Sequence, residues 1–244
     1  MHPLILFRKL HKWVGLVLGL QLVLWTISGA AMAILDHHAV AGEHIAHAPE
    51  PAALTGAPLP LAAVQQRAGG EILGLQLRPL LDRSIYEVKT TGSVRLIDSR
   101  TGAPVVVDAG LARAVALQQY AGKGKVEQVT RLARPNMETR DREGPLWRVQ
   151  FDDPGDTAFY VSETTGQLLD KRTNAYRAWD FFWMIHIMDY TQRQSFNHPL
   201  IWTLATAGVW MSLTGLVLVF LAFRRQDFQP ILSLAGRLRR PRRA

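Results

Sequence analysis

Two long runs of apolar residues flank a polar middle region. No charged residue occurs in the 23 positions from Trp13 to Leu35 or in the 25 positions from Pro199 to Phe223. A helix of about 20 apolar residues crosses the hydrocarbon core of a bilayer, so both runs predict transmembrane helices. Residues 40–178, by contrast, carry Asp, Glu, Lys and Arg throughout. The pattern predicts an aqueous domain held between two membrane helices.

The polar region contains a repeated pattern. Residues 84–108 and 145–170 each begin with a strand of alternating apolar residues, pass through a turn and continue in a second strand that ends in Thr-Gly. Such strands joined by short turns are typical of β-hairpins. A helical segment precedes each hairpin, at roughly residues 61–68 and, after Asp108 as a good N-cap, residues 110–120. We therefore expect an α+β domain of two helix–hairpin repeats.

The predicted fold class is a membrane α-helical protein with two transmembrane helices and an extracytoplasmic α+β domain. The chain then divides into six segments: an N-terminal segment with the first transmembrane helix (1–38), a linker (39–60), the domain with the two repeats (61–175), an interfacial segment with aromatic residues and His (176–197), the second transmembrane helix (198–225) and a basic tail (226–244).

Lys and Arg are placed asymmetrically around the apolar runs. Arg8, Lys9 and Lys12 precede the first run, and neither residue type occurs between Leu35 and Arg67. Seven arginines follow the second run: Arg224, Arg225, Arg237, Arg239, Arg240, Arg242 and Arg243. Because cytoplasmic flanks carry an excess of Lys and Arg, we expect both termini in the cytoplasm and the middle domain outside the inner membrane.

The remaining composition narrows the possible classes of protein. The net charge of +8 is concentrated in part in a tail beside a membrane helix, which favours contact with anionic lipid and argues against nucleic acid. The chain has no cysteine, so disulfides, thiolate metal sites and CxxCH haem attachment are excluded. An alternative reading of residues 8–33 is a signal peptide cleaved after Ala31-Met32-Ala33. Its apolar core is longer than the usual 7–15 residues, and the second run would still anchor the chain.

Small residues and histidines share one face of the first predicted helix. Steps of three or four trace this stripe: His11, Gly15, Gly19, Leu22, Thr26, Ala30, Ala33 and His37. Gly15 and Gly19 form GxxxG, a pattern that lets helices approach closely and that also occurs where helices only pack. His11 begins the stripe at the cytoplasmic end, and His37, beside His38, closes it at the outer end.

A second stripe and an aromatic segment carry two more histidines. The stripe follows the second predicted helix: His198, Ile201, Ala205, Gly208, Ser212, Gly215 and Val219. Residues 176–190 favour a helix at the membrane interface, with these positions on one face: Trp179, Phe182, Trp183 and His186. Ionisable groups near a span indicate function, because burying them without a partner is costly. The alternatives are that His198 faces headgroups and that His186 snorkels in an aromatic belt.

Several of these motifs resemble a known family. YVSETTGQLLD, residues 160–170, is similar to the PepSY domain, which is built on a strand, a Thr-Gly turn and another strand. Three further motifs resemble the PepSY-associated transmembrane proteins: RKLHKWVGLVLGLQLVLWTISGA (8–30), FFWMIHIMDY (181–190) and SLTGLVL (212–218). The resemblance covers nearly the whole chain up to about Gln226. Longer relatives carry four spans, and two spans here imply a homodimer that supplies four helices.

The resemblance implies haem b as cofactor. It gives His11, in the LHKW motif, and His186 as ligands of the haem iron, whereas His37, His38 and His198 are added by helical geometry alone. In a two-fold dimer, both copies of His11 would face each other near the cytoplasm. At the outer leaflet, His186 would share further haem with His37, His38 or His198.

The function that the resemblance implies is electron transfer across the bacterial inner membrane to a periplasmic ferric siderophore or other ferric iron. The electron donor is then a cytoplasmic flavin or NAD(P)H reductase, or quinol, because the chain lacks a dinucleotide fingerprint. A second hypothesis comes from isolated PepSY domains, which resemble protease propeptides and inhibitors: a membrane-anchored binding module without redox activity. A third is metal handling by His44 and His47 of the linker, which otherwise are solvated residues.

Overall fold

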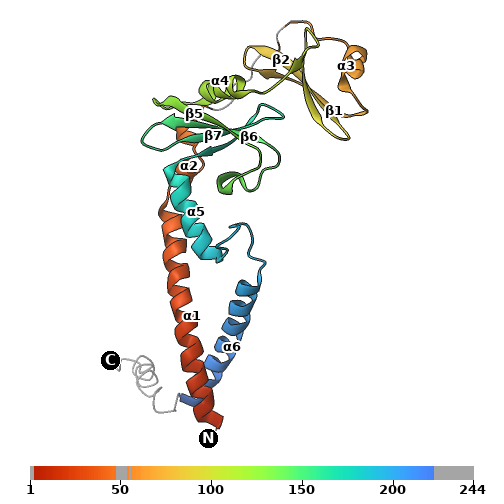
Figure 1. Ribbon diagram of the computed structural model, residues 1–244. Helices are drawn as coiled ribbons and strands as arrows, with labels where there is room; N and C mark the ends of the chain where they lie inside the picture. The colour runs from red at the N-terminus through yellow and green to blue at the C-terminus, as the bar shows by residue number, and fades with distance from the viewer. Residues whose placement is uncertain (1–2, 48–53, 55, 223–244) are drawn as a thin grey trace, which may run out of the picture.

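A helical stalk carries a domain of two β-sheets at one end (Figure 1). The computed structural model describes residues 3–47, 54 and 56–222, so the predicted basic tail and His2 lie outside the described residues. The stalk is built from α1 (Pro3–Ile34), α5 (Asn174–Ile187) and α6 (Pro199–Ala222). Both α1 and α6 are long and apolar enough to cross a membrane, as the sequence predicts.

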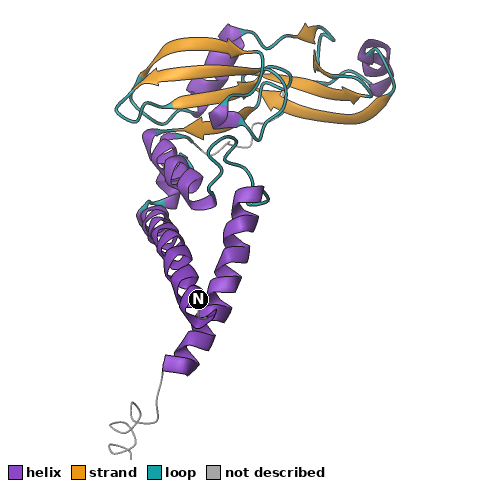
Figure 2. Ribbon diagram, turned by 60° about the horizontal axis from the view of Figure 1, so that its bottom comes forward, coloured by secondary structure: helices purple, strands orange, loops and turns teal. Residues whose placement is uncertain are grey.

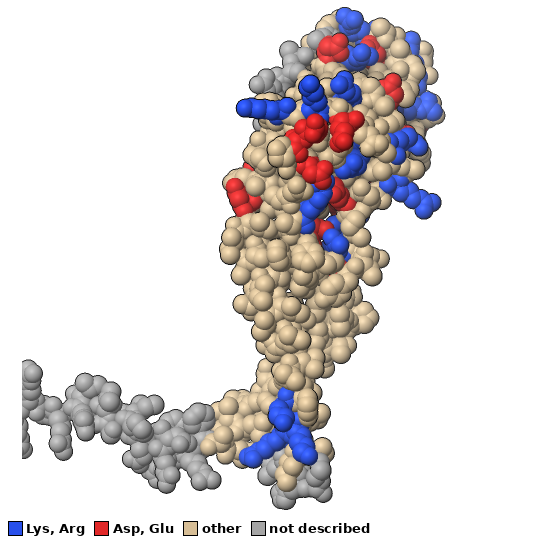
Figure 3. All heavy atoms as spheres, turned by 60° about the vertical axis from the view of Figure 1, so that its left-hand side comes forward, with Lys and Arg blue, Asp and Glu red and all other residues tan. Residues whose placement is uncertain are grey.

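The two long helices form a V. They lie together at the end that holds the N-terminus of α1 and separate toward the sheets (Figures 1 and 2). Figure 3 shows a band without charged side chains on one face of the stalk, between the basic residues at that end and the mixed charges of the sheet domain. Large apolar side chains of α1 and α6, such as Leu20, Trp202 and Phe220, are exposed, which suits a lipid environment.

The first membrane helix ends earlier than the predicted stripe requires. The chain leaves α1 at Ile34, and Asp36 caps the short helix α2 (His37–Val40) by accepting a hydrogen bond from the backbone N–H of His38 at 2.9 Å. A one-turn 3₁₀ helix, η1 (Glu43–Ile45), follows. The prediction that His37 continues the α1 stripe is therefore wrong, because the cap starts a separate helix.

The predicted linker is partly packed. The backbone N–H of His47 donates to the carbonyl of Gln119 at 2.8 Å, and the N–H of Ala121 donates to the carbonyl of Ile45 at 2.9 Å. These bonds tie residues 43–47 to the end of a helix in the sheet domain. The structure thus differs here from the flexible linker expected from composition.

Each half of the sheet domain consists of a helix followed by four antiparallel strands. The first half contains α3 (Leu61–Ala68), β1 (Ile72–Leu80), β2 (Arg83–Thr90), β3 (Val94–Asp98) and β4 (Pro104–Val105), and its sheet has the order β1-β2-β3-β4. The second half contains α4 (Ala109–Gln119), β5 (Lys125–Leu132), the 3₁₀ turn η2 (Met137–Thr139), β6 (Leu146–Asp152), β7 (Ala158–Ser162) and β8 (Leu168–Arg172), and its sheet has the order β5-β6-β7-β8. The predicted hairpins are present, and β1 and β5 are strands that the sequence pattern did not predict.

Local sequence explains where these elements begin and turn. Asp108 caps α4 by accepting a hydrogen bond from the N–H of Leu111 at 2.8 Å, as predicted. In the two Thr-Gly turns, Gly102 and Gly166 have φ of +73° and +68°. Only glycine adopts this left-handed conformation without a Cβ penalty. The backbone conformation therefore explains the glycine of each Thr-Gly turn.

One hydrophobic core joins the two halves. Ile85 and Leu96 of the first sheet, Val115 of α4, and Phe151 and Phe159 of the second sheet belong to a single buried cluster. Across the junction, the indole N–H of Trp147 donates to the carbonyl of Val107 at 2.8 Å. The two halves of the sheet domain are therefore packed together through a shared core.

Candidate functional site

His11 lies where α1 and α6 approach each other. Its Nδ1 is 2.7 Å from Oγ1 of Thr214 on α6. The next residue, Gly215, borders the ring, since a Cβ there would be 3.4 Å from Cε1 of His11. Trp210 lies one turn before Thr214 on α6, and the centroid of its ring is 6.4 Å from that of the His11 imidazole. The imidazole is thus half-buried between two membrane helices and held by a hydroxyl.

His186 occupies a matching position at the other end of α1. It lies on the last turn of α5, and its Nδ1 is 3.1 Å from Oγ of Ser28. A Cβ at Gly29 would be 3.3 Å from Cε1 of His186. Here the imidazole comes from α5, while the hydroxyl and the glycine come from α1. His186 is also half-buried.

The two histidine sites share one design. In each, a hydroxyl residue followed by glycine, Ser28-Gly29 or Thr214-Gly215, receives an imidazole from another helix. Ser28 is the one buried residue among the described side chains of α1, and Thr214 is the one buried residue of α6. Neither Nε2 of His11 nor Nε2 of His186 has a hydrogen-bond partner among the described residues. Each ring therefore keeps one nitrogen for a ligand.

The sites are far apart along α1. His11 and Ser28 are separated by 17 positions of a continuous helix, which at 1.5 Å per residue corresponds to about 26 Å. His11 and His186 of one chain therefore belong to different sites.

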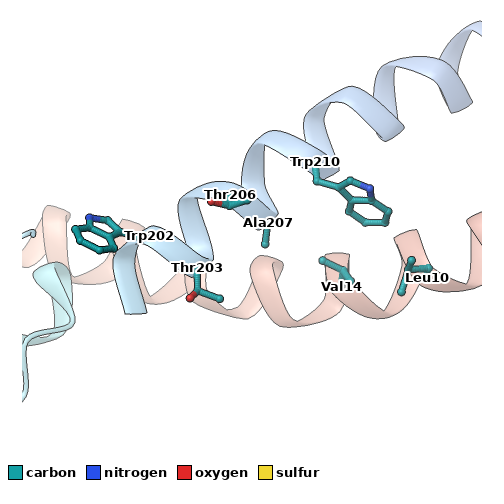
Figure 4. Close-up of a pocket in the computed structure, with 7 residues that line it drawn as sticks. All are labelled: Leu10, Val14, Trp202, Thr203, Thr206, Ala207 and Trp210. Atoms are coloured by element: carbon teal, nitrogen blue, oxygen red, sulfur yellow. The ribbon is translucent and has the colours of Figure 1, made fainter. Parts of the chain in front are cut away.

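A pocket opens beside His11. Its volume is about 620 Å³, and Figure 4 shows α1 and α6 on its two sides. Seven residues line it: Leu10, Val14, Trp202, Thr203, Thr206, Ala207 and Trp210. Leu10 and Val14 flank His11 on α1, and Trp210 is the ring next to His11. The lining is apolar except for two threonines and the indole N–H groups.

Two buried polar groups near the other site have no partner among the described residues. They are Nε2 of Gln21 and Nε1 of Trp25. Both are hydrogen-bond donors, and with Ser28 they follow the i, i+4, i+7 spacing that places residues on one face of a helix. The α1 face that meets His186 thus carries two unused donors toward the middle of the helix. A buried donor without an acceptor is costly, so this face suits a ligand or partner that accepts hydrogen bonds.

The other candidate histidines are placed differently. His198 precedes α6, and its Nε2 donates to the carbonyl of Ile187 at 3.0 Å, which ties the start of α6 to the end of α5. His37 and His38 are exposed on α2, and Nδ1 of His38 is 2.5 Å from Glu43. The carboxylate of Glu43 raises the pKa of His38. His44 and His47 are exposed, and the described residues contain no group of three or more His, Asp or Glu that could hold a metal ion.

Ser28 and Thr214 are the site residues that sequence reasoning missed. The signal was present as a hydroxyl residue followed by glycine in both quoted helix motifs, WTISGA and SLTGLVL. In the second predicted stripe, Gly215 lies next to His11. A Cβ added at Gly208 would meet no described atom within 4 Å, and Ser212 is exposed. The face of α6 that meets α1 is therefore rotated from the predicted one.

A buried ionic group fixes α5, and with it His186, to the sheet domain. Asp180 of α5 accepts hydrogen bonds from Arg140 at 2.7 Å and from Arg193 at 2.6 Å, and its side chain is 7% exposed. One turn earlier, Arg177 donates to Glu138 at 2.7 Å. Tyr160 of β7 donates to the same Glu138, and burial raises the pKa of Tyr160 to about 12. Arg140 and Glu138 belong to the segment between β5 and β6, so these ion pairs attach α5 to the second half of the sheet domain.

The fold and the two histidine sites define a membrane protein with two apolar helices, a domain of two antiparallel sheets and imidazoles at both ends of the stalk. The family described as the PepSY-associated TM region matches residues 8–244. The chain belongs to this family, as the sequence analysis predicts. Comparison with curated proteins gave no match, and neither did comparison with solved structures.

Proposed function

We propose that this protein is a haem b-containing transmembrane oxidoreductase that passes electrons to a periplasmic acceptor, a ferric siderophore or other ferric iron. The observation that supports it most is the pair of half-buried imidazoles, His11 and His186. Each is held through Nδ1 by a hydroxyl and leaves Nε2 without a partner among the described residues. Neutral imidazole with a free ring nitrogen is a usual axial ligand of haem iron.

The surroundings of both histidines fit a flat apolar cofactor with acidic edges. The pocket of about 620 Å³ between α1 and α6 is within the size range of cofactor sites and is lined mainly by apolar groups; His11 is not one of its seven lining residues but is next to Leu10 in the sequence. Glycine at positions 29 and 215 leaves room next to Cε1 of each imidazole, since a Cβ would lie 3.3 Å or 3.4 Å from that atom. The donors of Gln21 and Trp25, which have no partner among the described residues, suit hydrogen-bond acceptors of such a cofactor on the α1 face that meets His186.

A second copy of the chain would complete the ligand sets. His11 and Ser28, the contact of His186, are about 26 Å apart along α1, so His11 and His186 of one chain would not hold the same haem. In a homodimer with two-fold symmetry, the two copies of His11 would come together near the basic end and would hold the cofactor there. His186 would take its partner ligand from His37, His38 or His198, of which His198 already donates through Nε2 to Ile187 and offers Nδ1.

The chain itself would bind, orient and insulate the cofactor. Haem, when bound, supplies one-electron transfer. Arg8, Lys9 and Lys12 beside His11 place positive charge at the proposed cytoplasmic surface, where the electron donor, a flavin or NAD(P)H reductase or quinol, would dock. The sheet domain, next to His186, would face the periplasm and the ferric acceptor.

Spectroscopy of the full-length protein, expressed with ample haem and purified in detergent, tests the proposal. Dithionite reduction should give the Soret and α bands of haem b, and a pyridine haemochrome assay should give haem bound per chain. His11→Ala and His186→Ala should each remove part of this haem, whereas the exposed His44→Ala should remove none. A folded wild-type protein without Soret absorbance would refute the proposal and favour the membrane-anchored binding module.

A further inference from the structure

The hydroxyl groups at the two histidine sites are placed to donate to the helix backbone. Oγ of Ser28 donates to the carbonyl of Leu24 at 2.7 Å, four residues earlier on α1. Oγ1 of Thr214 donates to the carbonyl of Met211 at 3.1 Å, three residues earlier on α6. A carbonyl oxygen only accepts, and a hydroxyl has a single hydrogen. In this geometry neither hydroxyl can also donate to the imidazole.

When the hydroxyl donates to the helix carbonyl in this way, the imidazole is the donor to the hydroxyl oxygen. With the hydroxyl hydrogen used, Oγ of Ser28 accepts from Nδ1–H of His186, and Oγ1 of Thr214 accepts from Nδ1–H of His11. A neutral imidazole carries one hydrogen, so a proton on Nδ1 leaves a lone pair on Nε2. The opposite tautomer would require the Thr214 hydroxyl to give up its bond to the carbonyl of Met211 and to donate to Nδ1 of His11 instead.

From this geometry we propose that Ser28 and Thr214 are positioning residues that hold His186 and His11 in the Nδ1-protonated tautomer, with Nε2 presented to the cofactor. Their burial supports this role. Ser28 is 1% exposed and Thr214 is 5% exposed, although most neighbours on the same helices face outward. Partners of this kind fix the orientation of a ligating imidazole and raise its basicity, and their removal commonly lowers metal affinity by about 10- to 100-fold.

The tautomer assignment stands without haem, while its effect on a bound cofactor rests on the proposed function. The first measurement therefore uses the full-length protein expressed without haem, with ¹⁵N-labelled histidine, in detergent micelles. The ¹⁵N shifts distinguish a protonated from an unprotonated ring nitrogen, and His11→Gln and His186→Gln spectra assign the signals. We expect Nδ1–H for both residues in the wild-type protein. An Nε2–H tautomer at either site overturns the proposal for that site.

The second measurement removes the hydroxyls. Ser28→Ala and the nearly isosteric Thr214→Val should abolish the Nδ1–H preference of His186 and His11 respectively. In titrations with hemin, each variant should bind about 10- to 100-fold more weakly at the affected site. Any haem retained should have a higher midpoint potential, because a less basic imidazole stabilises ferric iron less. Ser28→Thr and Thr214→Ser keep the hydroxyl and should restore the wild-type values.

Matched controls lie on the same helices. Thr26 donates to Leu22 and Ser212 donates to Gly208, and neither hydroxyl meets an imidazole. Thr26→Val and Ser212→Ala should leave tautomers, hemin affinity and potential unchanged. Folded Ser28→Ala and Thr214→Val variants with wild-type tautomers and potentials would overturn the proposal while leaving haem binding intact. A wild-type protein that binds no hemin would instead refute the proposed function and leave the tautomer result valid.

Discussion

Two glycines determine how closely each imidazole approaches its neighbouring helix. A Cβ at Gly29 or Gly215 would lie 3.3 Å or 3.4 Å from Cε1 of the adjacent histidine, so the ring would have to move by a few tenths of an ångström. Alanine favours a helix over glycine by about 1 kcal/mol, so neither substitution should unfold the protein. We expect Gly29→Ala and Gly215→Ala to weaken hemin binding on the order of tenfold.

Hemin titration of the purified variants checks this expectation. Gly208→Ala is the matched control, because a Cβ there meets no described atom within 4 Å. Equal affinity in Gly29→Ala, Gly215→Ala and the control would show that the imidazoles are not confined by the glycines.

Sequence analysis named the two histidines as candidate ligands but did not identify the hydroxyl residues that contact them. His11 and His186 followed from family motifs and from their place beside apolar runs. Ser28 and Thr214 were not recognised, because Ser and Thr in membrane helices ordinarily bond to a carbonyl three or four residues earlier, as both do here. Their second contact depends on how three helices rotate against one another, and a single-chain pattern does not contain that rotation.

Among the elements, α5 links the sheet domain to the membrane helices, and Asp180 is its main ionic contact. Asp180→Asn leaves Arg140 and Arg193 without their shared buried carboxylate, and loss of one member of a buried ion group costs about 3–5 kcal/mol. We expect the thermal midpoint of the detergent-solubilised protein to fall on the order of 10 °C. His186 should also be held less firmly, because Asp180 attaches its helix, α5, to the second half of the sheet domain.

Asp156→Asn provides the comparison for the thermal measurement. Asp156 pairs with Arg177 but is 57% exposed, so its loss should cost less than about 1 kcal/mol. Similar midpoints for Asp180→Asn and Asp156→Asn would contradict a structural role for the buried group.

The two strands that the sequence pattern missed, β1 and β5, were missed for a common reason: both are edge strands. β1 contains Gly74 and Pro79, two residues that argue against a central strand, and it lies at the edge of its sheet, where both are tolerated. β5 is the edge strand of the other sheet and is mostly polar. The central strands, whose apolar residues alternate into the core, were the ones that periodicity predicted. At the end of α1, the capping role of Asp36 was overlooked, which misplaced His37.

For the whole molecule, the V of α1 and α6 leaves part of the small-residue face of α1 open. A Cβ at Gly15 would be 2.8 Å from Met211 of α6, whereas a Cβ one turn later at Gly19 meets no described atom within 4 Å. In the proposed homodimer, a helix of the second copy would pack at Gly19. Gly19→Leu should then raise the dimer dissociation constant at least roughly tenfold, or 1.4 kcal/mol.

Native mass spectrometry across a dilution series measures this change. Val17→Leu is the control, because Val17 is exposed and lies about 200° around the helix from Gly19. A Gly19→Leu dimer as stable as the wild type would remove this face from the proposed interface. A monomeric wild type would remove the dimer itself.

The placement of the two imidazoles at opposite ends of α1 links the proposed chemistry to the membrane voltage. The span of about 26 Å between them approaches the thickness of the hydrocarbon layer, about 30 Å, across which most of the voltage drops. An elementary charge that crosses this layer exchanges about 2.3 kcal/mol per 100 mV. Electron export from a negatively charged interior would therefore be electrogenic: an energised cell would assist turnover, and each electron exported would partly discharge the membrane.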